Sequence, residues 1–382
     1  MEKNKCTIAK NIKKMKHLFI YDRYLFFTVL VAVIFGLLMI TSAAAIYATL
    51  RFEDQYFFLK RQIIFGVLPG FLALFLLARI DYHVWKRWSV VGFIGSLIAL
   101  GLVFVPGIGT SAYGATRWID LGFISFQPSE MAKLAIIIYL AAWLSSKGQK
   151  QVGNVLEGLI PFIVVLSFIG FFIYKQPDVG TLGLIIAISF IMFFSAGAQL
   201  SHIFTMAGLG SFLFFILIRT ASYRWDRFMT FLNPSSDPQG KGYQINQALI
   251  AIGSGSFWGV GLGQSRQKFN YLPEPVGDSI FAIIGEELGF IGTIFTLSFF
   301  IFLVTRGLLI AKNAPDEFGR LLAIGITSWI GIQAIFNISA ITGIMPLTGM
   351  PLPFISYGGT SLAFSLAAMG ILLNISSQTI RR

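Results

Sequence analysis

The sequence is poor in charged residues, in cysteine and in histidine. Charged residues make up 12% of its 382 residues, whereas a soluble domain carries about 25%. The surface of such a chain is apolar, which lipid tolerates and water does not. The one cysteine, Cys6, excludes an intramolecular disulfide framework, and the three histidines lack the spacing of metal ligands, which excludes a structural zinc site.

Hydrophobic residues, by contrast, make up 55% of the chain, with 39 Phe and 39 Gly. They gather in runs of about 17–25 residues, which is the length that crosses roughly 30 Å of hydrocarbon as a helix. We therefore predict an all-α fold, a polytopic transmembrane bundle of about ten helices. The predicted spans are Tyr24–Ile46, Gln62–Ala78, Ser89–Val105, Pro128–Leu144, Gly158–Ile173, Val179–Ala196, His202–Arg219, Ser279–Thr305, Leu321–Thr342 and Phe354–Ser376.

We expect one transmembrane domain, residues 24–376, between a basic tail (1–23) and a short tail (377–382). Seven Lys and Arg residues stand within the first 23, so much of the net charge of +12 precedes the first span. This placement favours a cytoplasmic anchor beside anionic lipid headgroups over a nucleic-acid-binding surface. The positive-inside rule then places both termini on the cytoplasmic side. We expect no cleaved signal peptide, because the first apolar run is too long.

The connection between the seventh and eighth spans, residues 220–277, is long, polar and glycine-rich, and this orientation places it outside the cell. Its retained aromatic and aliphatic residues favour a functional loop over a disordered one. Ile245, Leu249 and Ile252 recur at helical spacing, which predicts a short amphipathic helix on the membrane surface at 243–252. The glycines at 253–263 lack a phosphate-loop pattern, so we expect them to serve tight turns and close packing.

Asp278 stands where this loop enters the eighth span. It is either the N-cap of that helix or a general base that takes a proton from an attacking hydroxyl. The two interpretations are compatible, because a helix N-terminus stabilises a carboxylate anion. Glu286 lies about 12 Å further along the helix axis, too far to form a close catalytic pair with Asp278. We expect Glu286 or Glu287 to pair with a basic residue in the bundle.

Two further groups combine basic residues with hydrogen-bonding neighbours. Pro128 opens the fourth span, and Glu130 and Lys133 share one face of it as an intrahelical ion pair. Alternatively, Lys133 faces a cavity and contacts a pyrophosphate or a catalytic carboxylate, joined by Arg117 from the preceding external loop. The second group, from Arg224 to Gly242, is either a solvated loop or a contact surface for a ligand that carries phosphate and sugar.

Ordered motifs extend from residue 24 to 376. They are Gly-Ala-Thr-Arg117-Trp-Ile, Gln-Pro-Ser-Glu130-Met-Ala-Lys133, Gln176-Pro-Asp178-Val-Gly-Thr181, Arg227-Phe-Met-Thr-Phe-Leu-Asn233-Pro, Gly261-Leu-Gly-Gln-Ser265, Gln267-Lys268, Tyr271-Leu-Pro-Glu274, Ile-Gly-Glu286-Glu-Leu-Gly289 and Pro353-Phe-Ile-Ser-Tyr357-Gly-Gly. In this order they resemble the signatures of the SEDS family (shape, elongation, division and sporulation). Several motifs are more similar to its cell-division members than to its elongation members, whereas Trp118-Ile-Asp-Leu-Gly122 leans the other way.

The resemblance departs from the family at one point. Family members usually read His-Thr-Asp-Phe where this chain reads Val276-Gly277-Asp278-Ser279. The roles of the neighbouring residues therefore cannot be carried over, but the role of Asp278 as catalytic base can. Candidate substrate-binding residues are those in the matching motifs and in the second basic group: Arg117, Glu130, Lys133, Arg224, Arg227, Asn233, Lys268 and Glu274.

The resemblance implies a peptidoglycan glycosyltransferase that polymerises lipid II into β-1,4 glycan strands at the outer face of the bacterial cytoplasmic membrane. A divalent cation (Mg or Mn) could assist by neutralising pyrophosphate charge, although no ligand cluster stands out. The expected partners are lipid II, membrane lipid, a class B penicillin-binding protein and other divisome proteins, with no nucleic acid. The alternatives are a lipid II flippase, a role in elongation, and a non-catalytic scaffold for a transpeptidase.

Overall fold

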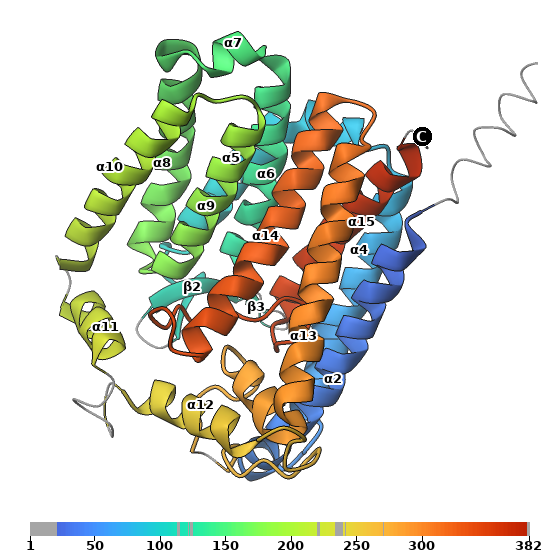
Figure 1. Cartoon of the computed structure of the whole chain (residues 1–382), viewed down its shortest axis with the longest axis vertical. Helices are drawn as coiled ribbons and strands as arrows, with labels where there is room; N and C mark the ends of the chain where they lie inside the picture. The colour runs from blue at the N-terminus through green and yellow to red at the C-terminus, as the bar shows by residue number, and fades with distance from the viewer. Residues whose placement is uncertain are drawn as a thin grey trace, which may run out of the picture.

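The computed structural model describes residues 21–112, 115–120, 122, 125–219, 222–233, 240, 242–269 and 271–379. A helix stands at each of the ten predicted spans (Figure 1). In this described part, seven helical segments are long and apolar enough to cross a membrane, and α9 is a shorter apolar helix. The prediction of an all-α, polytopic transmembrane bundle is confirmed.

The helices at the first seven spans are α2 (Arg23–Phe52), α3 (Phe57–Gln62) continued by the π-helix η1 (Ile63–Val67) and α4 (Leu68–Arg79), α5 (His83–Leu102), α6 (Pro128–Ser146), the π-helix η2 (Val155–Leu159) continued by α8 (Ile160–Lys175), α9 (Val179–Ser195) and α10 (Leu200–Arg219). Both π-helices stand just before a proline, Pro69 or Pro161, in the first turn of the next helix. Because proline lacks an N–H, it interrupts the regular hydrogen-bond ladder, and the wider turn accommodates the gap.

The last three spans are α13 (Ile280–Lys312), α14 (Glu317–Ile341) and α15 (Gly359–Gln378). The predicted start of the tenth span at Phe354 is wrong, since the helix begins only at Gly359. Phe354 has a φ of 65°, which no helical residue adopts. Residues 342–358, which we call the α14–α15 segment, therefore form a non-helical connection.

Shorter elements lie between the spans: α7 (Gln149–Val152), α11 (Ser222–Leu232), α12 (Tyr243–Ser254), and the strands β1 (Gly109–Ala112), β2 (Ala115–Asp120) and β3 (Ser125–Phe126). The three strands form one antiparallel sheet in the order β1-β2-β3. An external loop was predicted here, and the sheet was not. Residues 115–120 do not alternate between apolar and polar side chains, so the periodicity that indicates a strand is absent here.

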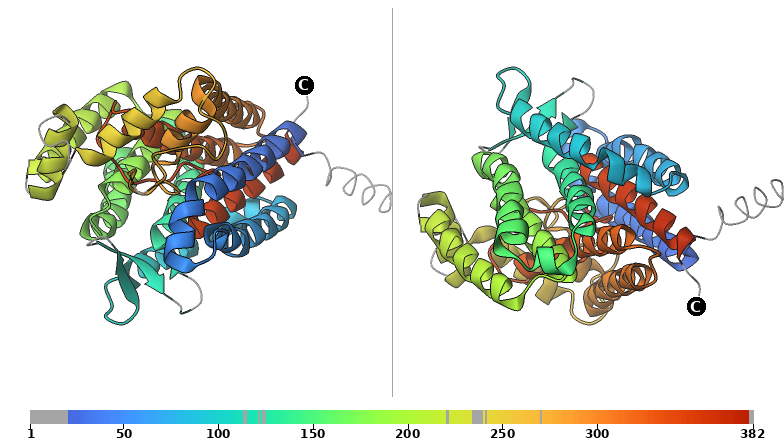
Figure 2. Two further views of the ribbon diagram at one scale, coloured as in Figure 1. Left: turned by 90° about the horizontal axis from the view of Figure 1, so that it is seen from below. Right: turned by 90° about the horizontal axis from the view of Figure 1, so that it is seen from above.

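The helices differ in how closely they pack. α4 packs along α15, and glycine makes their close approach possible: a Cβ on Gly370 would lie 2.5 Å from the carbonyl oxygen of Leu74. Small residues take this role in membrane bundles, where apolar surface alone does not drive helix association. α10 lies at the edge of the bundle away from α2, α4 and α15 (Figures 1 and 2).

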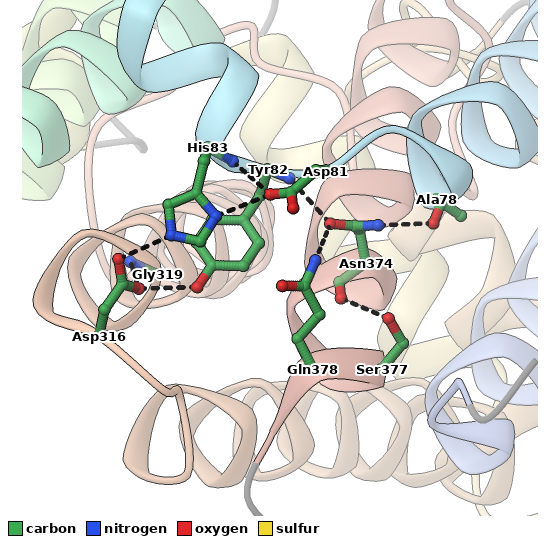
Figure 3. A network of polar contacts seen from close by, with 9 residues as sticks. All are labelled: Ala78, Asp81, Tyr82, His83, Asp316, Gly319, Asn374, Ser377 and Gln378. Carbon is green, nitrogen blue, oxygen red and sulfur yellow. Dashed lines mark hydrogen bonds and ion pairs between the residues drawn. The ribbon is translucent and has the colours of Figure 1, made fainter. Parts of the chain in front are cut away.

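The two ends of the bundle carry different elements. α11 and α12 lie at the end where α13 begins, and α7 lies at the opposite end (Figure 1). Figure 3 shows a polar network at the α7 end, in which the Tyr82 hydroxyl donates to Asp316 (2.7 Å) and the amide of Asn374 donates to the carbonyl of Ala78 (2.8 Å). Burial of Tyr82, together with its bond to Asp316, raises the pKa of its phenol. The network ties the α4–α5 turn to α14 and α15.

Replacing Gly370 with alanine should destabilise the α4–α15 contact. The added methyl group collides with backbone atoms of Leu74, which cannot rotate away, and overpacking of this kind costs about 1–3 kcal/mol. Thermal unfolding of purified protein in detergent measures the effect. Gly92→Ala on α5 is the matched control, because a Cβ there meets nothing within 4 Å. An equal midpoint for the two variants would contradict this packing.

Candidate active site

Asp278 lies in a turn just before α13. The chain turns at 274–279 through bonds from the amides of Gly277 (3.0 Å) and Ser279 (3.3 Å) to the carbonyl of Glu274. The helix begins at Ile280 with Ser279 as its N-cap and without a side-chain capping bond. The predicted N-cap role of Asp278 is therefore wrong, because this turn places Asp278 one residue too early and leaves its carboxylate available for other contacts.

The half-buried carboxylate of Asp278 faces α12. The side-chain amide of Gln244 donates to both of its oxygens, at 3.3 and 3.4 Å, and the Ser279 hydroxyl donates at 3.4 Å. Sequence reasoning missed Gln244, since nothing in the local pattern shows which residue meets an aspartate 34 positions away. These donors stabilise the anionic form of a carboxylate.

α12 confirms the predicted helix at 243–252, and its position on the membrane surface stays a prediction. Ile245, Ala248 and Ala251 are buried and α12 packs against α13, whereas Leu249 is 42% exposed. Alanines allow the closer approach, and a Cβ on Gly285 of α13 would already meet Ile252 at 3.1 Å. This rotation of α12 brings Gln244 to Asp278.

The α14–α15 segment forms a second wall beside Asp278. A Cβ on Gly349 would lie 4.0 Å from an Asp278 carboxylate oxygen, and the amide of Tyr357 donates to the carbonyl of Val276 (2.8 Å). Most of the segment between Met350 and Ser356 is buried. Irregular backbone at this depth is tolerated only where protein groups satisfy it.

Glu130 and Lys133 form the predicted ion pair within α6. The Lys133 ammonium lies 2.8 Å from a Glu130 oxygen, and the two residues are 1% and 3% exposed. The ammonium also donates to Gln333 (3.0 Å) and lies 4.9 Å from the ring centre of Trp329. The second oxygen of Glu130 is buried without a hydrogen-bond partner among the described residues. The structural interpretation of the pair is thus supported, and contact of Lys133 with a pyrophosphate stays a prediction.

We expected Glu286 or Glu287 to pair with a basic residue, and Lys268 pairs with Glu287. Its ammonium lies 3.0 Å from Glu287 and also donates to the carbonyl of Gly263 (2.6 Å) and the hydroxyl of Ser42 (3.4 Å). Lys268 is 4% exposed and Glu287 is fully buried. All three N–H groups of Lys268 thus have acceptors inside the protein, a geometry that stabilises the fold; its substrate-binding role stays a prediction.

α13 is interrupted beside this cluster. Gly289 has a φ of 65° and a ψ of −158°, which breaks the helix after Leu288. In place of helical amides, the amides of Val260 and Gly261 donate to the carbonyls of Glu286 (3.0 Å) and Glu287 (3.1 Å). Gly259 must be glycine in this arrangement, because a Cβ would lie 2.2 Å from the Glu287 carbonyl oxygen. The expectation of close packing is confirmed for Gly255 and Gly259, and the expectation of tight turns for Gly259, Gly261 and Gly263, which have positive φ angles; a Cβ on Gly253 would meet nothing within 4 Å.

The remaining candidates are spread over several elements. Arg117 on β2 donates to the carbonyls of Gln176 (3.1 Å) and Pro177 (2.6 Å) and so fastens the α8–α9 turn. Glu274 is exposed in the turn before Asp278, and Asn233 follows α11. Arg224 and Arg227 belong to α11, but the structure does not describe their side chains.

No protein ligand set for a divalent cation stands out. Among the described residues, no three His, Cys, Asp or Glu side chains come together as a metal site requires. The immediate neighbours of Asp278 described above are an amide and a hydroxyl, which are weak ligands by themselves. The described residues therefore do not by themselves fit a resident Mg or Mn ion.

Comparison with known proteins places this geometry in a family. The family model of FtsW, RodA and SpoVE, described as cell cycle proteins, matches residues 22–381. The chain belongs to this family. It is the SEDS family that the ordered motifs indicated, and the chain is accordingly an integral membrane protein.

Curated relatives and solved structures agree with one another. Stage V sporulation protein E of Bacillus subtilis (strain 168) is 44% identical over 93% of this chain and 96% of its own length. Probable peptidoglycan glycosyltransferase FtsW of Geobacter sp. (strain M18) is 41% identical over 94% and 97%. The crystal structure of Rod shape determining protein RodA of Thermus thermophilus superposes with a TM-score of 0.70 at 27% identity, over 95% and 99%. The resemblance to cell-division members of the SEDS family is confirmed.

A second solved SEDS-like chain belongs to an assembly. It comes from a peptidoglycan synthase complex described by its structural coordination of polymerization and crosslinking. The two chains superpose with a TM-score of 0.76 at 25% identity, over 95% of this chain and 100% of that chain. The SEDS fold is therefore shared along nearly the whole length.

Replacing Lys268 with methionine should strongly destabilise the protein. The change leaves the Glu287 carboxylate buried without its cation, which costs about 3–5 kcal/mol. Thermal unfolding should show recovery in the double variant Lys268→Met/Glu287→Gln, which removes both charges. Lys60→Met is the control, because the pair of Lys60 with Asp54 is exposed and such pairs contribute little. Loss of activity with unchanged stability would instead favour substrate binding by Lys268.

Proposed function

We propose that this chain is a peptidoglycan glycosyltransferase that polymerises lipid II into β-1,4 glycan strands during cell division. Membership of the SEDS family and the name of its FtsW relatives support the activity and the division role. The observation that carries the proposal is the placement of Asp278, a half-buried carboxylate at one end of a membrane bundle. The buried carboxylates Glu130 and Glu287 are paired with Lys133 and Lys268 inside the bundle, whereas Asp278 lies at its end, where a substrate can reach it.

The reaction follows from this placement. Asp278 accepts the proton of the 4-hydroxyl of an acceptor N-acetylglucosamine, and that oxygen forms a bond to the anomeric carbon of the donor. The bond from this carbon to the pyrophosphate oxygen breaks, and undecaprenyl pyrophosphate leaves with the electron pair. Attack opposite the leaving group converts the α-linked donor into a β-linked product. A divalent cation, if bound with the donor, would neutralise charge on the pyrophosphate as it leaves.

Gln244 supports this role of Asp278. Its amide donates to both carboxylate oxygens through long bonds of 3.3 and 3.4 Å. Long bonds hold the carboxylate in one orientation while leaving it able to accept a stronger bond from a hydroxyl, as catalytic contacts in substrate-free sites commonly do. The exposed Glu274 and the positions of Arg224 and Arg227 on α11 belong to the same end of the bundle, where they would contact the sugar and phosphate groups.

The proposed site faces the outside of the bacterial cytoplasmic membrane, and both termini are cytoplasmic. The support is the cluster of seven basic residues within the first 23 positions, which the positive-inside rule places in the cytoplasm. α2 then leads outward, and α13 starts at the outer end. Lipid II must already be in the outer leaflet for this site to act on it.

A class B penicillin-binding protein is the proposed partner, with other divisome proteins. The support is the SEDS-like chain of the peptidoglycan synthase complex, which coordinates polymerization with crosslinking. A lipid II flippase, an elongation role and a non-catalytic scaffold are the competing functions. A flippase or a scaffold needs no external base, so the behaviour of Asp278 separates them from an enzyme.

Asp278→Asn should lower the polymerisation rate by about 10²–10⁴-fold, because the amide cannot accept the proton. Purified protein is incubated with lipid II, with and without the cognate transpeptidase, and glycan strands are resolved on a gel. Asp54→Asn is the matched control, since this carboxylate is held by Lys60 in the turn after α2. Polymerisation by Asp278→Asn at the wild-type rate would exclude Asp278 as the base and favour a flippase or scaffold.

Cysteine labelling tests the orientation. In a Cys6→Ser background, Glu274→Cys and Asn313→Cys place single thiols before and after α13, and both positions are exposed. In intact cells, a membrane-impermeant maleimide should label position 274 and leave position 313 unlabelled until the membrane is opened. The reverse pattern would place Asp278 in the cytoplasm, where the proposed chemistry has no substrate.

A further inference from the structure

α14 carries a buried polar stripe that the proposed reaction does not use. Trp329, Gln333 and Asn337 are four residues apart, so they share one face of the helix. They are 0%, 1% and 1% exposed. Polar side chains inside a membrane bundle are costly unless they are satisfied, and they commonly serve a function.

Asn337 joins two segments that are distant in the sequence. Its side-chain NH₂ group donates to the carbonyl of Asp278 and to the carbonyl of Met350, both at 2.8 Å. An amide NH₂ group has two hydrogens, and each carbonyl takes one. The main chain at Asp278 is thereby held to the α14–α15 segment through a single side chain.

Gln333 makes the corresponding contact one helical turn away. Its NH₂ group donates to the carbonyl of Pro351 (2.9 Å), and its oxygen accepts from Lys133 (3.0 Å) and from the indole of Trp329 (2.8 Å). Met350 and Pro351 are consecutive residues. The α14 stripe therefore links the buried Glu130–Lys133 pair and the main chain of Asp278 to the same short piece of backbone.

We propose that Asn337 is a positioning residue that holds Asp278 at its place for proton transfer, an inference that rests on the proposed function. Asp278 precedes the first turn of α13, so the regular helical ladder does not fix its carbonyl, and Asn337 does. Proton transfer requires the base within hydrogen-bond reach of the hydroxyl. A displacement of about 1 Å at a reacting group lowers the rate by about 10²-fold.

Asn337→Leu tests this role, because leucine has a similar size and no donor. The matched control is Asn374→Leu at the other end of the bundle (Figure 3). The NH₂ group of Asn374 donates to Ala78 (2.8 Å), its oxygen accepts from the amide of Tyr82 (2.9 Å), and it is 5% exposed. Both variants remove a buried amide from between backbone groups, so we expect similar losses of thermal stability.

Only Asn337→Leu should change catalysis. We expect kcat for lipid II polymerisation to fall by about 10²-fold with KM nearly unchanged, because the base moves and the substrate contacts remain. Asn374→Leu should keep the wild-type kcat. If Asn337→Leu does not yield folded protein, Asn337→Asp keeps the shape and replaces the donor with an oxygen, and it should show the same fall in kcat.

A double-mutant cycle separates positioning from a general loss of structure. In an Asp278→Asn background, Asn337→Leu should leave the residual rate unchanged, because an absent base cannot be misplaced. Three results would each overturn the inference. The first is that the kcat losses of Asn337→Leu and Asp278→Asn multiply in the double variant. The others are a wild-type kcat in Asn337→Leu and equal kcat losses in Asn337→Leu and Asn374→Leu. These results leave the proposed function intact as long as Asp278→Asn shows its expected loss of rate; a fully active Asp278→Asn overturns the proposed function and the positioning role together.

Discussion

Backbone that leaves helical geometry inside this bundle must find its hydrogen-bond partners within the protein, because lipid offers none. Two places meet this constraint. The break in α13 at Gly289 frees the carbonyls of Glu286 and Glu287, and the amides of Val260 and Gly261 occupy them. The loop before α13 is thereby fastened to the helix that Asp278 precedes, and the candidate site depends on this attachment.

The α14–α15 segment meets the same constraint with side chains. Gln62 of α3 donates to the carbonyl of Ser356 (3.3 Å) and accepts from the amide of Gly358 (3.0 Å). Gln333 and Asn337 hold the carbonyls of Pro351 and Met350 from the other side. A buried, irregular segment is thus kept in one conformation beside Asp278, as a site that must hold its groups within fractions of an ångström requires.

The charged groups divide according to their surroundings. Lys133 and Lys268 lie in the interior, where each has a carboxylate partner and further acceptors. Removing the carboxylate partner of either lysine would leave an uncompensated charge in the low-dielectric interior and would destabilise the protein. Asp278 instead lies half-buried, and a side-chain amide and a hydroxyl donate to its carboxylate. Burial thus distinguishes the paired lysines, which stabilise the fold, from Asp278, to which we assign the proton transfer.

How far the site could be predicted differs from residue to residue. The motif around Asp278 predicted its role as the base, which stays a prediction. The spacing of Glu130 and Lys133 indicated their ion pair, because residues three apart share one face of a helix. The N-cap assignment of Asp278 was wrong because the turn at 274–279 shifts the helix start by one residue. Gln244, Gln333 and Asn337 were missed, because each forms a hydrogen bond with a residue distant in the sequence, and no local pattern shows such a contact.

The amino-acid sequence by itself determined the membrane environment, the ten helical spans and the family. Those properties follow from composition, from the length of apolar runs and from motifs, which are local features of a chain. Only the tertiary structure decided which polar residues meet across helices: Asn337 with Asp278, Gln333 with Lys133, and Lys268 with Glu287. Such contacts depend on how each helix is rotated and packed, and apolar periodicity is too weak a signal for that in a bundle whose helices face lipid on one side and protein on the other.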